Sequence, residues 1–151
     1  MENLEMQSDR FWDSMQAIDH GYEEYAKATG MTYMSMTVLK EIYEHTDGCT
    51  QKQICEVTHY PKQSVNLIVK SFWESGYVEL KENPTDRRNK TIVFTAKGRE
   101  YADRVVGALW QVDKEVMGQF TAEEQAELLR MLNLYEKGFC EKIQGLIQAE
   151  Q

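Results

Sequence analysis

The chain has 151 residues, of which 42% are hydrophobic and 28% are charged, and its formal net charge is -8. This composition is ordinary for a folded domain, and the length allows an oligomerisation element beside one core. No apolar run is long enough to cross a membrane, and the acidic start lacks the basic and apolar parts of a signal peptide. We therefore expect a cytoplasmic protein.

The charge is distributed unevenly along the chain. Residues 50–99 contain nine Lys or Arg and five Asp or Glu, whereas the other residues contain eight and twenty. The negative total argues against binding to nucleic acid, because such binding relies on neutralising phosphates. A basic middle between acidic ends can nevertheless form an electrostatic footprint on one face.

Two helices with apolar seams are predicted at the start of the chain. The first ends near Gly30, and its apolar residues mostly follow one another in steps of three and four. These residues are Leu4, Phe11, Met15, Ile18, Tyr22 and Tyr25. The second helix covers about residues 32–46, with Met34, Val38, Leu39 and Ile42 on one face.

A short helix and a longer one follow, separated by a three-residue break. Thr50 and Gln53 have capping-box spacing and begin the short helix, whose inward residues would be Ile54, Cys55 and Val57. Pro61 suits the first turn of the longer helix. That helix ends at Gly76, buries one face and turns a polar, basic face outward, which is the form of a helix-turn-helix. The buried face is Val65, Ile68, Val69 and Phe72, and the outward face is Lys62, Gln63, Ser64, Asn66 and Lys70.

A β-hairpin is predicted directly after this helix pair. Its strands are Val78–Lys81 and Ile92–Phe94, joined by a turn of about eight residues that begins at Asn83-Pro84. The cations Arg87, Arg88 and Lys90 would lie at its tip. Such a hairpin is a wing, and cations at its tip can reach a minor groove or phosphates.

The end of the chain predicts two more helices with apolar seams. Thr95 is a candidate N-cap for the first, and Thr121 opens the second with a capping box. A small winged core cannot bury these seams together with that of the first helix, so they must pack on each other, on a second subunit, or on both. We expect a winged helix-turn-helix domain over 31–99 and a helical dimerisation region over 1–30 and 100–151.

With these elements in order, the chain resembles the MarR family of winged helix-turn-helix transcriptional regulators over essentially its whole length. The most specific segment is DRRNKTIVFTAKG (86–98), which is similar to the wing signature Asp-x-Arg, a strand and Thr-x-Lys-Gly. The segment TQKQICEVTHYPKQSVNLIVKSFWESGYV (50–78) supports it. The resemblance implies a homodimer held by the terminal helices on a pseudo-palindromic operator of double-stranded DNA. It also implies that Arg88 enters the minor groove and that Asp86 orients it.

Two sets of site residues follow from the pattern and the resemblance. The expected DNA-binding residues are Thr50, Gln51, Lys52, Lys62, Gln63, Ser64, Asn66, Lys70, Asp86, Arg87, Arg88 and Lys90. The family binds small, often aromatic effectors, and the expected pocket residues are Phe11, Trp12, Tyr22, Tyr33 and Met34. Packing within a dimer is the alternative explanation for those aromatic and methionine side chains.

Other functions have less support in the sequence. His45, Cys49, Cys55 and His59 match no standard zinc spacing, and no phosphate loop or nucleophile elbow is present, so we expect no metal, no cofactor and no enzyme. The first helix has no cysteine, which argues against the peroxide-sensing branch of the family. We expect a dimeric, DNA-binding repressor controlled by a small molecule. The alternative is a winged-helix protein-interaction adaptor that binds no specific DNA.

Overall fold

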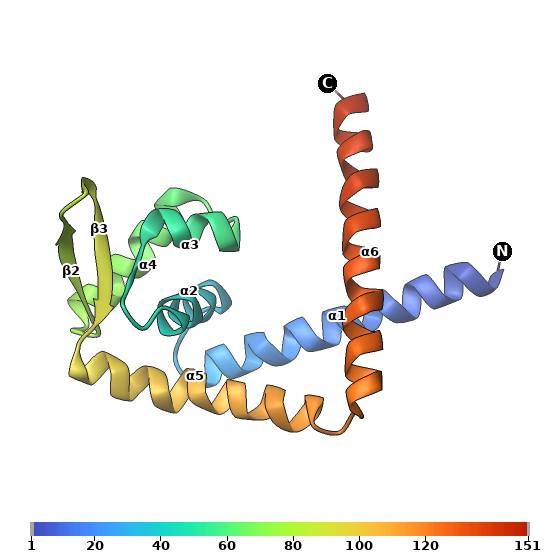
Figure 1. Ribbon diagram of the computed structural model, residues 1–151, viewed down its shortest axis with the longest axis horizontal. Coiled ribbons are helices and arrows are strands. Elements are labelled where there is room, and N and C mark those ends of the chain that lie inside the picture. Colours follow the sequence, from blue (N-terminus) through green and yellow to red (C-terminus); the bar gives the residue numbers. More distant parts are fainter. Residues whose placement is uncertain (1, 151) are drawn as a thin grey trace. The chain divides into compact units, whose positions relative to one another are not determined.

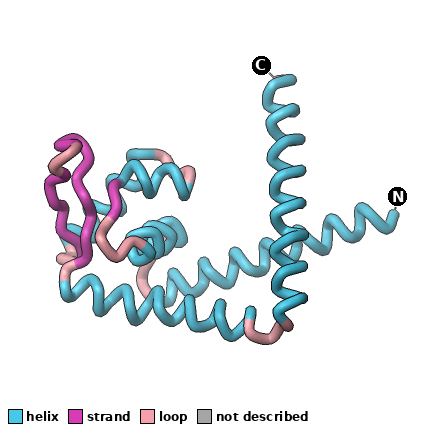
Figure 2. Tube along the Cα trace, viewed as in Figure 1, coloured by secondary structure: helices cyan, strands magenta, loops and turns pink. Residues whose placement is uncertain are grey.

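Helices make up most of the chain, and a small antiparallel sheet stands among them in the computed structural model, which describes residues 2–150 (Figures 1 and 2). The elements in order are α1 (Glu2–Ala28), α2 (Tyr33–Glu44), β1 (Cys49–Thr50), α3 (Gln51–Thr58), α4 (Lys62–Glu74), β2 (Val78–Asn83), β3 (Asp86–Phe94), α5 (Ala96–Met117) and α6 (Ala122–Ala149). The predicted fold class, mainly helical with a β-hairpin wing on a helix-turn-helix, is confirmed. No helix within the described residues is long and apolar enough to span a membrane.

Two compact units form along the chain, Met1–Ala108 and Leu109–Gln151, and the boundary between them falls within α5. The core of the first unit joins α2, α3, α4, the sheet and the start of α5. Its largest fully buried side chains are Met36, Val38, Leu39, Ile42, Cys49, Ile54, Val65, Val69, Val78, Ile92 and Val106. The expected division between a winged domain over 31–99 and a dimerisation region stays a prediction.

Side-chain caps begin several helices where the sequence predicts them. The Thr50 hydroxyl accepts a hydrogen bond from the Gln53 N–H at 3.2 Å, and the Gln53 side chain accepts one from the Thr50 N–H at 2.8 Å. Thr121 and Glu124 form the same reciprocal pair at the start of α6. Both predicted capping boxes are confirmed, and each satisfies two backbone donors that a helix leaves without partners.

The short helix α3 corrects one part of the predicted core. Ile54 is buried as predicted, but Val57 is 58% exposed and Cys55 is only partly buried. An eight-residue helix buries one narrow stripe, in which Ile54 is followed one turn later by Thr58. The Thr58 hydroxyl donates to the Ile54 carbonyl at 2.7 Å, and Val57 lies to the side of that stripe.

The wing has longer strands and a tighter turn than the sequence suggests. Strands β2 and β3 pair from Val78↔Phe94 to Asn83↔Asp86, so only two residues connect them, and the predicted eight-residue turn is wrong. The Asn83 side-chain carbonyl accepts from the Thr85 N–H at 3.1 Å and from its hydroxyl at 2.8 Å. This local turn closes the hairpin early, and the cations of residues 87–90 therefore lie on β3.

The strand β1 was not predicted. It pairs antiparallel with β3 through Cys49↔Ile92 and Thr50↔Thr91, which gives the sheet the order β1-β3-β2. Two residues are too few to show an alternating pattern in the sequence. The pairing attaches the start of α3 directly to the wing.

A set of close contacts, here called the Thr95 junction, joins the end of α4, the base of the wing and the start of α5. The Thr95 hydroxyl donates to the Gly76 carbonyl at 2.6 Å and accepts from the Gly98 N–H at 3.0 Å, so its predicted role as an N-cap is confirmed. The Thr95 N–H donates to the Tyr77 carbonyl at 3.0 Å. The Lys97 ammonium donates to the Ser75 carbonyl at 2.8 Å.

Gly98 is buried at this junction, where there is no room for a side chain. A Cβ atom added to it would overlap the carbonyl group of Tyr77 and come within 2.8 Å of the Tyr77 Cα. The Tyr77 ring in turn stacks on the ring of Tyr101, one turn further along α5, with centroids 4.6 Å apart.

Replacing Gly98 by Ala is expected to destabilise the first unit by about 1–3 kcal/mol, the usual cost of inserting a methyl group into a packed site. The matched control is Gly21→Ala in α1, where an added Cβ meets nothing within 4 Å and where Ala should stabilise the helix by up to about 1 kcal/mol. Thermal and urea unfolding measure both. Equal or greater stability of the Gly98→Ala variant would contradict the close approach.

Candidate nucleic-acid interface

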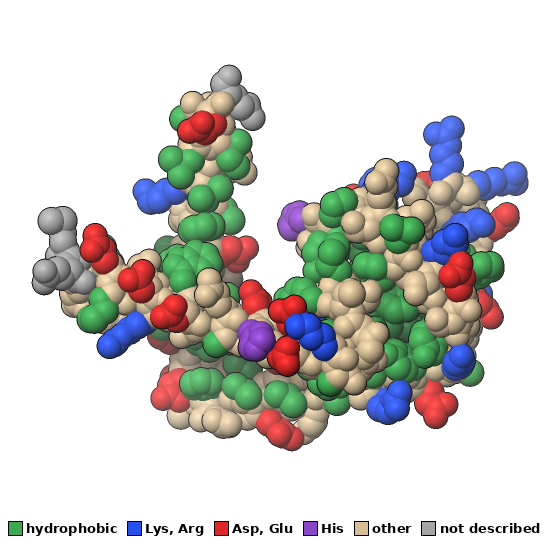
Figure 3. Space-filling model, turned by 180° about the vertical axis from the view of Figure 1, so that it is seen from behind, with side chains coloured by type: hydrophobic (Ala, Val, Ile, Leu, Met, Phe, Trp, Pro, Cys, Tyr) green, Lys and Arg blue, Asp and Glu red, His purple; other side chains and the backbone are tan. Residues whose placement is uncertain are grey.

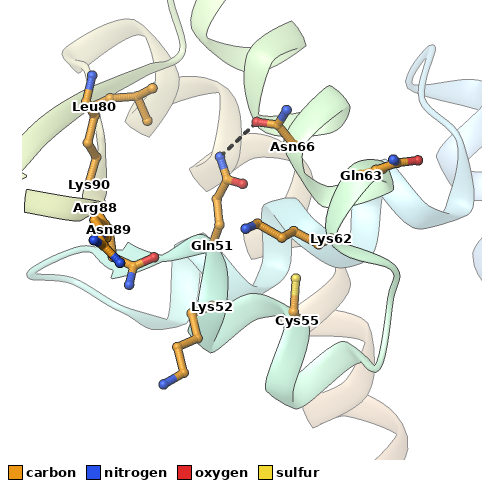
Figure 4. Close-up of a pocket in the computed structure, with 10 residues that line it drawn as sticks. All are labelled: Gln51, Lys52, Cys55, Lys62, Gln63, Asn66, Leu80, Arg88, Asn89 and Lys90. Atoms are coloured by element: carbon orange, nitrogen blue, oxygen red, sulfur yellow. Dashed lines mark hydrogen bonds between the residues drawn. The ribbon is translucent and has the colours of Figure 1, made fainter.

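A groove of about 720 Å³ lies between α3, α4 and the wing (Figure 4). Its lining residues come from all three elements. They are Gln51, Lys52 and Cys55 of α3, Lys62, Gln63 and Asn66 of α4, and Leu80, Arg88, Asn89 and Lys90 of the wing. Four of these ten side chains are cations and none is an acid.

The cations of this face are only weakly engaged by acidic neighbours. Lys52 lies 3.8 Å from Glu56, and Lys70 lies 3.8 Å from Glu74, each pair exposed and one helical turn apart. Exposed pairs of this kind contribute little free energy. A phosphate group can therefore replace the carboxylate as the partner of each ammonium group with little loss of free energy. Figure 3 shows Lys and Arg side chains projecting from the part of the first unit that holds the wing.

The position of α4 is fixed by its buried face. Val65, Val69 and Phe72 are buried, which turns Gln63 and Asn66 outward on the opposite side. The Gln51 side chain donates to the side-chain oxygen Oδ1 of Asn66 at 3.4 Å, so α3 and α4 are also linked across the groove (Figure 4). Pro61 immediately precedes the helix with φ of -58°, and His59 ends α3 in the left-handed region with φ of 57°.

The carboxylate of Asp86 organises the wing tip through hydrogen bonds. One oxygen accepts from the Arg88 N–H at 3.0 Å, and the other accepts from the Asn89 side-chain amide at 2.8 Å. These bonds, chiefly that from Asn89, lower the pKa of Asp86 below its ordinary value, so the group is ionised at neutral pH. The resemblance implied that Asp86 orients the Arg88 guanidinium. The contacts formed here act instead on the backbone of Arg88 and on Asn89.

The structure brings together seven of the twelve expected DNA-binding residues in the groove. These are Gln51, Lys52, Lys62, Gln63, Asn66, Arg88 and Lys90. Thr50 is occupied as a helix cap, Ser64 is partly buried, and Asp86 supports its neighbours. Lys70 and Arg87 are exposed outside the groove lining.

Three groove residues were missed by sequence reasoning. Asn89 could have been found from its position three residues after Asp86, where an amide can bond the carboxylate. Cys55 lies one turn after Gln51 and Lys52, and was instead assigned to the core. Leu80 faces the groove because β2 pairs in the register Leu80↔Ile92, which no short pattern predicts.

The residues expected to line an effector pocket are only partly together. The rings of Tyr22 and Tyr33 meet edge to face with centroids 6.5 Å apart, and Met34 is partly buried beside Tyr33 in sequence. Phe11 and Trp12 contact each other at 5.6 Å, but Phe11 lies eleven residues before Tyr22, about 16 Å along the helix. Within one chain the expected residues thus fall into two groups along α1, and a shared pocket stays a prediction.

A smaller cavity does lie beside Tyr33. Its volume is about 390 Å³, and Gln16, Asp19, His20 and Glu23 line it together with Tyr33. Partial burial raises the pKa of the Tyr33 phenol, and the nearby Asp19 carboxylate raises it further. The phenol is therefore a neutral hydrogen-bonding group in a cavity that carries two carboxylates.

The cysteines and histidines of the described residues do not cluster. No group of three His, Cys, Asp or Glu side chains among the described residues could hold a metal ion. All three cysteines are free thiols, and burial raises the pKa of Cys49 to about 12. Cys49 thus remains a protonated core residue, while Cys55 lines the groove.

A helix-turn-helix followed by a wing, with basic side chains in the groove between them, defines a winged helix-turn-helix protein. The model of the MarR family matches residues 29–89. An HTH-type transcriptional repressor of Mycobacterium tuberculosis is 23% identical over 103 residues, which is 68% of this chain and 73% of that protein. Residues 29–89 therefore match the MarR family, and the whole chain has the winged helix-turn-helix fold of that family's transcriptional regulators.

Solved structures of the family share the fold. A MarR family regulator from Neisseria meningitidis superposes with a TM-score of 0.75 at 22% identity, covering 92% of this chain and 97% of that one. A mutant MarR from E. coli, complexed with operator DNA, gives a TM-score of 0.61 at 22% identity, covering 83% and 90%. At these identities the likeness shows a shared fold, and it does not show that the groove residues have the same roles.

Proposed function

We propose that this chain is a repressor that binds operator DNA through the groove between α3, α4 and the wing. The observation that carries the proposal is the collection of four cations from three elements in one groove of a chain whose net charge is -8. A groove lined by four cations and no acid fits a polyanion. The operator complex of the E. coli relative supports the choice of DNA. Such a partner also fits the expected cytoplasmic location.

The proposed contacts follow from the side chains on each element. α4 lies in the major groove, where Gln63 and Asn66 can bond adenine in a bidentate manner. Lys52, Lys62 and Lys90 contact phosphates, which fix the register of the protein on DNA. Arg88 enters the minor groove, whose negative potential attracts a guanidinium group.

Arg88→Ala is expected to weaken operator binding by about 1–3 kcal/mol, and to reduce the salt dependence of binding by about one unit. Lys90→Ala should cost less, and equally on operator and scrambled DNA. The matched control is Lys81→Ala, which removes an exposed wing cation that does not line the groove. Fluorescence anisotropy at several salt concentrations measures all of them. Arg88→Ala binding both DNAs as tightly as the unchanged protein would rule out the wing as a reader.

Removing the carboxylate of Asp86 tests the wing tip in a different way. Loss of an anion near DNA should strengthen binding, whereas loss of its bonds to Arg88 and Asn89 should disorder the tip and weaken binding. We expect Asp86→Ala to weaken binding, because the arrangement of the tip decides where Arg88 points. Tighter binding by Asp86→Ala would remove the supporting role of Asp86 and leave the role of Arg88 intact.

A homodimer is the second part of the proposal. α6 has no buried residue, and apolar side chains are exposed along its length (Figure 3). The exposed leucine, methionine and isoleucine residues of α6 are Leu128, Leu129, Met131, Leu132, Leu134, Leu146 and Ile147. An exposed apolar surface on this scale indicates an interface. A second copy is the partner we favour, because a palindromic operator needs two α4 helices in symmetric positions.

The dimer should sediment at about twice the chain mass of 17.6 kDa at micromolar concentration. Leu132→Glu places a charge in the exposed apolar surface of α6 and should produce monomers or aggregates. Asn133→Glu is its control, because it adds the same charge at a neighbouring exposed polar position. A stable, folded monomer of the unchanged chain would refute this part.

Control by a small molecule is the third part. The acidic cavity beside Tyr33 favours a cationic aromatic ligand, because Asp19 and Glu23 supply the opposite charge and the Tyr33 ring supplies a π face. Occupation of this cavity would alter the angle between α1 and α2. In a dimer, such a change moves the two α4 helices away from the spacing of about 34–36 Å that successive major grooves require.

Arylalkylamines such as benzylamine, which are protonated at neutral pH, should therefore raise the melting temperature and weaken operator binding, whereas the corresponding aromatic carboxylic acids should do neither. Asp19→Asn should abolish the response to amines, and Asp13→Asn, an exposed change on the same helix outside the cavity, should preserve it. A screen by thermal shift and anisotropy tests the idea. Responses to acids alone, or to neither class, would contradict it.

A further inference from the structure

The outward face of α4 carries one large apolar side chain in its second turn. Leu67 is 66% exposed, although the neighbouring buried face of the helix is closely packed. It lies one turn after Gln63 and one turn before Lys70, and it follows Asn66 directly. This spacing places Leu67 in the same outward stripe as the polar residues of the proposed DNA-binding face.

The exposure of Leu67 does not by itself indicate a contact, because single apolar side chains are common on protein surfaces. The residues beside Leu67 indicate which group on DNA it would contact. Gln63 and Asn66 both line the groove and both have the amide group that bonds adenine. An adenine contact in the major groove implies a thymine on the same base pair, and the C5-methyl group of thymine projects into that groove.

Leucine can make no hydrogen bond to phosphate or to a base edge. On the DNA-facing side of α4 its only favourable contact is with an apolar group, and the thymine methyl is the apolar group that the major groove presents. Lys70, one turn further along α4, is exposed and can hold the adjacent phosphate, which would keep Leu67 close to the base edges.

We propose that Leu67 is a specificity-determining residue that reads the C5-methyl group of a thymine, next to the base contacted by Gln63 or Asn66. The proposal rests on the proposed function, because it requires α4 to lie in the major groove. It goes further by assigning a base preference to a residue that makes no polar contact.

Deoxyuridine scanning isolates this contact, because replacing thymine by uracil removes one methyl group and leaves base pairing unchanged. The operator is first selected from a random DNA pool with the full-length protein. Each thymine of one half-site is then replaced in turn, and dissociation constants are measured for the unchanged protein, Leu67→Ala and Val57→Ala. Val57 is the control because it is an apolar residue of similar exposure, 58%, that lies on α3 and not on the helix proposed to enter the major groove.

We expect one uracil position to weaken binding of the unchanged protein and of Val57→Ala about fourfold, the usual effect of one buried methyl group. Leu67→Ala should bind the thymine operator more weakly and should not distinguish thymine from uracil at that position. Because Leu67 is exposed and Ala favours helix, the variant should keep the melting temperature of the unchanged protein.

Two results would overturn the assignment while leaving DNA binding intact: indifference of the unchanged protein to every uracil, or a uracil effect that persists in Leu67→Ala. Failure to select any operator would overturn the proposed function and this inference together. The two failures are therefore distinguishable within one set of titrations.

Discussion

The close approach of Gly98 to the backbone of Tyr77 is the constraint on which the winged part of the molecule depends. At this point α4 has just ended, β2 is about to begin, and the chain returning from β3 enters α5. Thr95 forms hydrogen bonds with both Gly76 and Tyr77, so the end of β3 is held against the segment that joins α4 to β2. The pairing of β1 with β3 fixes the start of α3 against the wing. Together with the Thr95 hydrogen bonds, this pairing holds α3, α4 and β3 so that their side chains converge on the groove.

The charge of the groove, and not the net charge of the chain, determines which ligands the groove can bind. The groove gathers four cations without an acidic lining residue, and the exposed carboxylates Glu56 and Glu74 hold their lysine partners weakly. The acidic remainder of the chain keeps the net charge negative, which limits binding to polyanions elsewhere on the surface. Asp86 is the exception on the basic side, and its hydrogen bonds explain why a carboxylate is tolerated beside Arg88: it orders the tip that carries the cation.

Much of the fold could be predicted because its signals are local. Thr50, Thr95 and Thr121 each cap a helix through bonds that span three residues, and the spacing of Val65, Val69 and Phe72 fixes which face of α4 is outward. The errors arise where partners distant in sequence decide. The hairpin closed at Asn83 because β2 and β3 pair for longer than their apolar residues indicate, and Leu80 entered the groove through that register. Leu67 was overlooked because an apolar residue on a polar face has meaning only once the groove beside it is known.

The salt dependence of operator binding counts the phosphates that the protein neutralises, so it measures the joint effect of the groove cations. For the unchanged 151-residue chain and a selected operator, the logarithm of the association constant should fall linearly with the logarithm of salt concentration. Its slope should be about -7, because each of the two protomers of the proposed dimer brings four groove cations to the DNA. A slope near zero, or binding no tighter than to scrambled DNA at every salt concentration, would contradict the account.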